Sequence, residues 1–238
     1  MDSRPLGSHR MVALVPARAG SVRVKGKNTR ILAGKPLFVW SVLAAQASKL
    51  FEAVIVSTDS SETADAAREV GALVHVRQAH HATADAPDHL WVRDALQAYP
   101  GAEIFSILRP TSPFRTAGTI RRAYAQFIAS GMDSLRAVEP VRQHPAKMWR
   151  VVDSMRMVSY EPLEWINGAP MWSSPLQVLD PVYVQNASLE LAWTATLRAT
   201  GTISGHRICP FLTDPLEGFD INTEDDWLLA EAKAARYL

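Results

Sequence analysis

From residue 11 to residue 138, short apolar runs alternate with helix-length segments, and this alternation limits the fold more than any other feature. Met11–Val15 is a continuous apolar run, typical of a strand buried on both faces. Strand, helix and strand then repeat, which is the pattern of parallel βαβ units with right-handed crossovers. The sequence predicts an α/β protein with a mostly parallel sheet flanked by helices. The predicted strands are 11–15, 53–59, 73–76, 103–108, 134–138, 182–186 and 203–209, and the predicted helices are 36–47, 61–70, 87–99, 116–130 and 223–238.

The rhythm breaks between residues 140 and 181, where six prolines occur. Such a density of proline excludes a central strand, so we expect an irregular insertion. Its aromatic residues cover either a substrate or partner subunit, or a small satellite core beneath loops. We therefore predict a disordered tail over residues 1–10 and one domain over 11–238 that carries this insertion.

The overall charge gives no attraction to polyanions. The net charge is +1 and the isoelectric point is about 7.9, so neither nucleic acid nor an anionic membrane is an expected partner. No apolar run approaches the ~18 residues of a membrane span. The single cysteine, Cys209, excludes a disulfide within the chain and fits a reducing, cytoplasmic location.

A basic loop follows the first predicted strand. Between Pro16 and Arg30 there are five basic residues and no acidic one, and Gly20 and Gly26 allow close backbone approach. Ligands of open α/β sheets bind beyond the carboxyl ends of the strands, so this loop predicts a phosphate cradle rather than a merely solvated loop. It matches neither the P-loop nor the G-x-G-x-x-G pattern. The basic residues are Arg18, Arg23, Lys25, Lys27 and Arg30.

These residues begin a set of motifs that resembles the CMP-sialic acid synthetases (acylneuraminate cytidylyltransferases). The set runs from residue 11 to the C-terminus and is weakest over 145–180. The resemblance implies a Rossmann-like fold of the nucleotide-diphospho-sugar transferase type, with a dimerisation lobe. The motifs are Val15–Asn28, Val56–Asp59, Leu108–Arg115, Gln185–Asn186 and Phe219–Thr223.

The resemblance also implies the binding residues. Ala17, Arg18, Ser21, Lys27 and Asn28 would bind the phosphates and nucleotide of CTP. Arg77 and Asp85 fall in a stretch similar to the family's cytidine-binding segment, although a plain surface loop is the alternative. The acceptor sugar would meet Arg109, Thr111, Ser112, Lys147, Gln185 and Asn186.

The segment Phe219–Thr223 resembles a metal motif with two carboxylates, which would hold Mg²⁺ (or Mn²⁺) against the phosphates. Here the first carboxylate is Asp220, and Asn222 replaces the second. We expect both residues to be metal ligands, with one negative charge fewer than usual. The histidines at 80, 81 and 89 lack the spacing of a zinc site.

Two further departures concern the acceptor. Arg109 stands where the family commonly has Gln, and Leu176 stands where it has an Arg that grips the sugar carboxylate. The later motif reads Asn186-Ala187 instead of Asn-Gly. We therefore hypothesise that Arg109 binds the carboxylate, or that the acceptor is not sialic acid.

The resemblance implies CMP transfer from CTP to the anomeric hydroxyl of an acidic nine-carbon sugar, with release of pyrophosphate. Arg18, Lys27 and Asp220 would be the catalytic residues, in a homodimer whose 140–181 insertion reaches toward the partner's site. Two alternatives stay open: a nucleotidyltransferase with a Kdo-like or sugar-phosphate acceptor, and a non-catalytic nucleotide-sugar-binding scaffold with a degenerate metal site.

Overall fold

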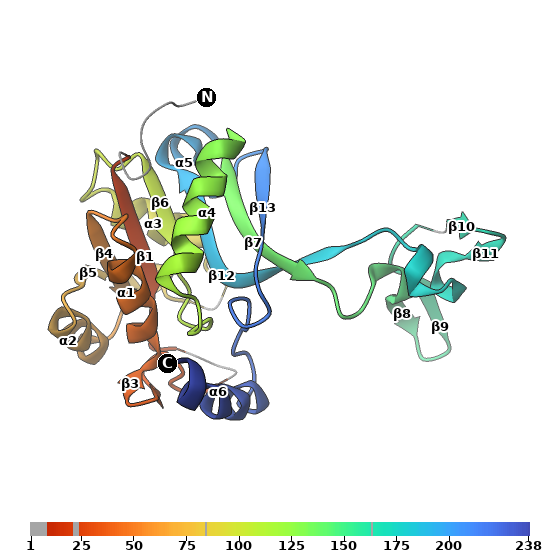
Figure 1. Cartoon of the computed structure of the whole chain (residues 1–238), viewed down its shortest axis with the longest axis horizontal. Coiled ribbons are helices and arrows are strands. Elements are labelled where there is room, and N and C mark those ends of the chain that lie inside the picture. Colours follow the sequence, from red (N-terminus) through yellow and green to blue (C-terminus); the bar gives the residue numbers. More distant parts are fainter. Residues whose placement is uncertain (1–8, 21–23, 84, 163) are drawn as a thin grey trace. The chain divides into compact units, whose positions relative to one another are not determined.

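A seven-stranded sheet forms the centre of the protein. The structure, a computed structural model, describes residues 9–20, 24–83, 85–162 and 164–238. The strand order is β13-β7-β12-β6-β1-β4-β5 (Figure 1). The pairs β1–β4, β1–β6 and β4–β5 are parallel, whereas β12 runs antiparallel to β6. The strands of this sheet are β1 (Met11–Pro16), β4 (Ala53–Thr58), β5 (Leu73–Val76), β6 (Ile104–Ile107), β7 (Ser134–Pro140), β12 (Tyr183–Trp193) and β13 (Ile208–Leu212).

Helices cover both faces of the sheet, which confirms the predicted fold class. On one face, α1 and α4 pack Phe38 and Phe127 against the strands. On the other, α3 and α5 contribute Trp91 and Leu197. A third core lies around Trp227 of α6. The helices are α1 (Leu37–Ser48), α2 (Ser61–Glu69), α3 (Asp88–Leu96), α4 (Ala117–Ser130), α5 (Thr194–Thr200) and α6 (Glu224–Tyr237).

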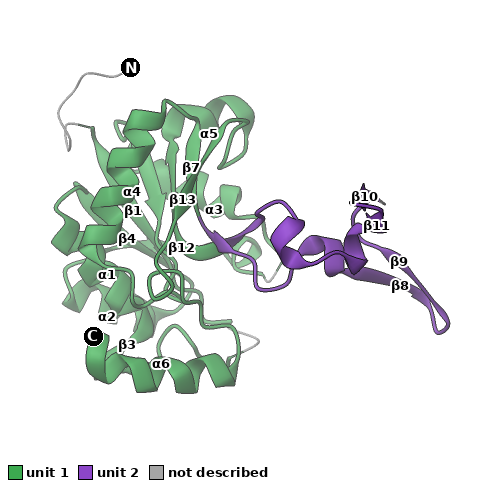
Figure 2. Ribbon diagram, turned by 45° about the vertical axis from the view of Figure 1, so that its right-hand side comes forward, with its two compact units in different colours: residues 1–137, 186–238 green, residues 138–185 purple. Residues whose placement is uncertain are grey.

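The chain divides into two compact units (Figure 2). Residues 1–137 and 186–238 form the first, and residues 138–185 form the second. The second unit contains the proline-rich segment. Its own hairpins are β8–β9 and β10–β11. Within it, the Trp149 and Trp172 rings lie 5.2 Å apart. The remaining short strands are β2 (Ile31–Leu32), β3 (Lys35–Pro36), β8 (Trp149–Asp153), β9 (Arg156–Ser159), β10 (Trp165–Ile166) and β11 (Ala169–Pro170).

Three expectations about element boundaries differ from the structure. β12 continues to Trp193, well beyond the predicted 182–186. The last strand begins at Ile208 instead of residue 203, because Asp133 binds the backbone N–H groups of His206 and Arg207 in a turn before it. In the predicted tail, residues 1–8 lie outside the described residues, and His9 is buried with its Nδ1 2.7 Å from the Tyr124 hydroxyl.

Candidate active site

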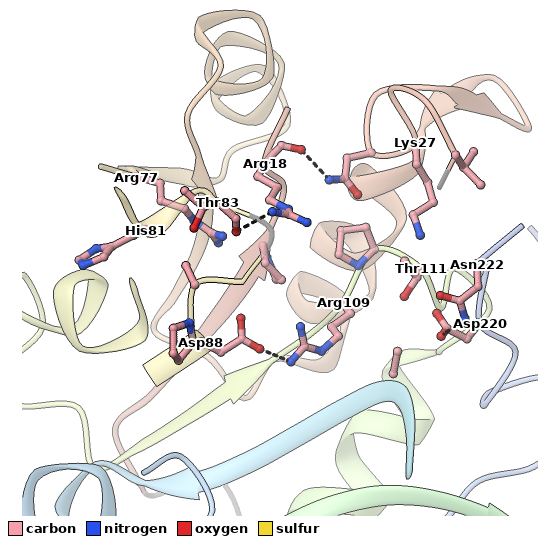
Figure 3. Close-up of a pocket in the computed structure, with 17 residues that line it drawn as sticks. Arg18, Lys27, Arg77, His81, Thr83, Asp88, Arg109, Thr111, Asp220 and Asn222 are labelled. Carbon is pink, nitrogen blue, oxygen red and sulfur yellow. Dashed lines mark hydrogen bonds and ion pairs between the residues drawn. The ribbon is translucent and has the colours of Figure 1, made fainter. Parts of the chain in front are cut away.

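A pocket of about 770 Å³ opens at the carboxyl ends of the parallel strands. Pro16 ends β1, Arg77 follows β5 and Arg109 follows β6, and all three contribute to its wall. Figure 3 shows Arg18, Arg77 and Thr83 on one side of the pocket, and Lys27, Asp220 and Asn222 on the other. The predicted site residues in the wall are Arg18, Lys27, Asn28, Arg77, Arg109, Thr111, Asp220 and Asn222.

The described part of the basic loop after residue 23 is held in shape by its own backbone and by Ile221. Gly26 has φ +62°, a conformation that glycine adopts at little cost. Lys27 is buried, and its Nζ donates to the Ile221 carbonyl at 2.5 Å. The Asn28 amide donates to the Arg18 carbonyl at 2.9 Å. The loop therefore presents Lys27 from a fixed position beside the 220–222 segment.

Three other residues predicted for the nucleotide do not line the pocket. Ala17 is buried, and its N–H donates to the Ser57 carbonyl at 2.9 Å, which extends the strand ladder. Asp85 is exposed, and its hydrogen bond with the Thr83 side chain lowers its pKa. Ser21 lies outside the described residues.

Arg18 joins the basic loop to the loop that follows β5. Its Nη1 donates to the carbonyls of Ala82 and Thr83, at 3.1 and 2.7 Å. On the same side of the pocket, Arg77 is buried with its guanidinium stacked 4.4 Å above the Trp91 ring. Burial lowers the pKa of Arg77 to about 10, so it remains a cation at neutral pH. Its Nη2 is buried and has no hydrogen-bond partner among the described residues.

Arg109 belongs to a network of charges. Its Nη2 donates to Asp88 at 2.5 Å and to Glu190 at 2.8 Å. Arg136 binds the other oxygen of Glu190 at 2.9 Å. Burial alone would lower the pKa of Arg109, but the charges of Glu190 and Asp88 outweigh it and raise that pKa. Both Nη2 hydrogens already donate to carboxylates of the protein. Arg109 would therefore have to bind a carboxylate of a ligand through Nη1 or Nε.

The Pro110–Pro113 turn closes the wall next to Arg109. Thr111 lines the pocket, and its carbonyl accepts the Ile221 N–H at 2.9 Å. Ser112 is buried away from the pocket wall. Behind the turn, the buried Arg115 donates to the carbonyls of Arg109 and Ser188, and burial lowers its pKa to about 9. Arg115 thus ties the end of β6 to β12.

Asp220 and Asn222 face the pocket from the segment before α6. The Asn222 amide donates to Asp220 Oδ2 at 2.6 Å. Asp220 Oδ1 is buried and has no hydrogen-bond partner among the described residues. Asp226 accepts the Asn222 N–H at 2.9 Å and forms the capping box of α6 with Thr223. Within the described part of the chain, no group of three or more His, Cys, Asp or Glu side chains could hold a metal ion.

The other predicted acceptor residues lie elsewhere. Asn186 is buried in β12, where its amide donates to the Thr213 hydroxyl at 2.8 Å. Lys147 and Gln185 belong to the second unit, in which Lys147 Nζ donates to the carbonyls of Trp172 and Ser174. Neither lines the pocket.

Sequence reasoning missed Asp88 and Glu190, the partners of Arg109. Asp88 is the first residue of α3, so an acidic residue there is ordinary for a helix start and gives no separate signal. Glu190 lies in an apolar strand 81 residues from Arg109. An acid inside an otherwise buried strand does indicate a charge partner, but the sequence does not say which.

The sheet and its cation-lined pocket define a nucleotide-binding α/β protein. A sequence profile of the cytidylyltransferase family matches residues 12–147. The chain is 34% identical to the CMP-N,N'-diacetyllegionaminic acid synthase of Legionella pneumophila, over 93% of this chain and 95% of the relative. It is 32% identical to the N-acylneuraminate cytidylyltransferase of Escherichia coli, over 66% of this chain and 37% of the relative.

The chain belongs to the cytidylyltransferase family, among its CMP-sialic acid synthetases, and is a nucleotidyltransferase. Solved structures agree on the fold. A CMP:2-keto-3-deoxy-manno-octonic acid synthetase complexed with CTP superposes with a TM-score of 0.69 at 14% identity, covering 96% of this chain and all of the other. Among the described residues, no helix is both long and apolar enough to cross a membrane.

Proposed function

We propose that the protein transfers CMP from CTP to the anomeric hydroxyl of a nonulosonic acid and releases pyrophosphate. One observation carries the proposal: Lys27, Arg18 and Arg77 converge on a single pocket at the carboxyl edge of the sheet. A pocket of about 770 Å³ has room for a nucleotide and a sugar. The name of the Legionella relative supports a nonulosonic acid as the acceptor.

In this reaction the protein positions its substrates and neutralises charge. The sugar hydroxyl attacks the α-phosphorus of CTP in line, a new P–O bond forms, and the bond to the β-phosphate oxygen breaks. Pyrophosphate leaves with the electron pair, and the proton of the hydroxyl passes to solvent. Lys27 and Arg18 stabilise the negative charge that moves onto the pyrophosphate.

Asp220 and Asn222 are the residues that would hold a divalent cation, Mg²⁺ or Mn²⁺. Asp220 Oδ1, buried and without a hydrogen-bond partner among the described residues, is the kind of oxygen that such a cation coordinates. When bound, the cation would neutralise phosphate charge beside Lys27. The side-chain oxygen of Asn222 would add a neutral ligand, so this site would have a weaker charge than a pair of carboxylates.

Arg109 and Thr111 are the acceptor residues that the pocket wall supports. Arg109 has two carboxylate partners, Asp88 and Glu190, and Arg136 also binds Glu190, so the two cations and two carboxylates are locally neutral and Arg109 offers hydrogen bonds instead of a free positive charge. This favours an acceptor whose hydroxyl or amide groups accept hydrogen bonds from Nη1 or Nε.

A homodimer is a further part of the proposal. The second unit exposes large apolar side chains, including Val151, Met155 and Trp165. Exposed apolar surface of this extent is typical of a contact region. The single cysteine supports a cytoplasmic location.

The decisive test is pyrophosphate release from CTP with Mg²⁺ and a panel of acceptors: nonulosonic acids, Kdo and sugar phosphates. We expect release with a nonulosonic acid only. Release with Kdo or a sugar phosphate would identify another nucleotidyltransferase. CTP binding without release for any acceptor would indicate the scaffold alternative, which Asn222 favours.

A further inference from the structure

One side of α3 organises the wall of the pocket. Asp88, Trp91 and Asp94 follow one another at intervals of three residues and therefore lie on neighbouring turns. Asp88 binds Arg109, and the Trp91 ring stacks under Arg77. Asp94, the third residue, contacts neither Arg77 nor Arg109. Its Oδ2 binds His75 Nε2 and lies 4.0 Å from Nδ1 of His81, which lines the pocket.

A chain of hydrogen bonds leads from Asp94 to Arg77. His75 Nε2 lies 3.1 Å from Asp94 Oδ2, and His75 Nδ1 lies 2.9 Å from Ser57 Oγ. Ser57 and His75 face each other across the parallel strands β4 and β5. Arg77 Nε then donates to Ser57 Oγ at 3.1 Å. Only the last member of this chain lines the pocket.

With a neutral His75, the donors and acceptors of this chain of hydrogen bonds fit one proton arrangement. Because Asp94 as a carboxylate can only accept, His75 Nε2 carries the proton and Nδ1 is the acceptor. Nδ1 therefore accepts the hydroxyl hydrogen of Ser57, and the Ser57 oxygen accepts Arg77 Nε–H. Ser57 is fully buried, so water cannot take the place of a missing partner.

The three residue types are those of a hydrolase triad, but the geometry is different. The nucleophile of a triad faces its substrate, and its histidine binds the serine through Nε2. Here Ser57 is buried in a central strand, and His75 binds it through Nδ1. Ser57 is therefore excluded as a nucleophile. The chain of hydrogen bonds ends instead on Arg77, a cation of the pocket wall.

We propose that Ser57, His75 and Asp94 are positioning residues that fix the Arg77 guanidinium for CTP binding. The chain holds Nε from one side while Trp91 supports the guanidinium face. These contacts leave Nη2 as the buried donor for the nucleotide. This inference rests on the proposed function, in that the pocket binds CTP.

The test compares variants by CTP affinity, measured calorimetrically, and by KM and kcat. His75→Leu and Ser57→Ala each break the chain of hydrogen bonds, and we expect the Kd for CTP to rise roughly 10- to 150-fold in each, as for losing a hydrogen bond to a charged group. The double variant should lose no more than either single one, since both remove the same chain. The KM for the acceptor should not change.

His75→Asn is the rescue variant. Its amide oxygen replaces Nδ1 as the acceptor for Ser57 but loses the contact with Asp94, so we expect a CTP affinity between those of wild type and His75→Leu. Exposed His206 provides the matched control, His206→Leu. The thermal midpoint of every variant reports folding.

Each result is decisive. Weak CTP binding by Arg77→Ala with normal binding by His75→Leu and Ser57→Ala would overturn the inference and leave the function intact. Equal losses in His75→Asn and His75→Leu would also overturn it. Normal CTP binding by Arg77→Ala would instead contradict the placement of the nucleotide in the proposed function.

Discussion

At the scale of single residues, buried cations shape the pocket. Arg109 has two carboxylate partners, whereas the partners of Arg115 among the described residues are carbonyl and hydroxyl oxygens. A buried charge is costly unless it is paired or fully hydrogen-bonded. Arg77 and Lys27 are intermediate between Arg109 and Arg115, because each has hydrogen bonds within the protein and also borders the cavity. The residues nearest the proposed phosphates are therefore those that gain most from an anionic ligand.

Replacing Lys27 with alanine should lower kcat by about 10²- to 10³-fold, the effect of losing one preorganised electrostatic group. Lys25→Ala, an exposed lysine of the same loop, is the control and should keep normal turnover. Steady-state pyrophosphate release measures both. Normal turnover of Lys27→Ala would contradict its assignment to the leaving pyrophosphate.

Replacing Asn222 with aspartate should change the response to Mg²⁺. A second carboxylate beside Asp220 increases the negative charge of the site, so the Mg²⁺ concentration for half-maximal activity should fall about 10-fold. Without Mg²⁺ the two carboxylates repel each other, and the thermal midpoint should fall below wild type. An unchanged Mg²⁺ dependence would show that Asn222 lies outside the cation's contacts.

At the scale of elements, Asp133 holds the turn that precedes β13. Asp133 accepts the backbone N–H groups of His206 and Arg207 and also binds the Arg207 guanidinium. Gly205, which precedes His206, has φ +65°, and a Cβ at this position would lie 2.8 Å from the Asp133 Cβ. Any other residue at 205 would disturb this turn. The anchor starts the strand at Ile208 and determines its register.

This anchor makes stability depend on pH in the acid range. Hydrogen bonds from the Arg207 backbone and side chain lower the pKa of Asp133 from 3.8 to about 2. The stabilisation is therefore complete above the unfolded pKa, and it disappears as the pH falls through the folded pKa. Asp133→Asn should have a lower Tm than wild type at pH 7, and the difference should vanish near pH 2. A constant difference across that range would contradict this account.

The elements were easier to predict than the site, for physical reasons. β1, α1 and the basic loop are local patterns, so strand periodicity and charge identified Arg18 and Lys27. β12 was predicted to end at residue 186, where Asn186 and then Ser188 and Glu190 interrupt the apolar pattern, but it continues to Trp193. Only the tertiary contacts of Glu190 with Arg109 and Arg136 explain the acid in this strand. Likewise, the environment of Arg77 depends on Ser57 and Trp91, which no local pattern connects.

At the scale of the whole molecule, the second unit has a weak core of its own. Of its large apolar side chains, Val151, Met155 and Trp165 are 73%, 95% and 65% exposed. A unit of this size buries little apolar surface by itself. We therefore expect contact with a second copy of the chain to cover these side chains.

Val151→Glu and Trp165→Glu should convert a dimer into a monomer of 26.2 kDa, because a buried carboxylate without a partner is costly at an interface. Light scattering coupled to size-exclusion chromatography measures the mass. Leu228→Glu, at an exposed leucine of α6, is the control and should retain the wild-type mass. A wild-type protein that is monomeric at micromolar concentration would contradict the proposed dimer.

The order of the sheet also has a consequence for synthesis on the ribosome. β12 lies between β6 and β7 in the sheet but follows both in the chain. β6 therefore has no neighbour on one edge until Tyr183–Trp193 has been made, an interval of roughly 4 to 17 seconds at ~5–20 residues per second. During this interval, β6 exposes unpaired backbone N–H and C=O groups to other nascent chains, although the strand is fully buried in the finished protein. We therefore expect the yield in a cell to depend on how well chaperones protect the β6 edge.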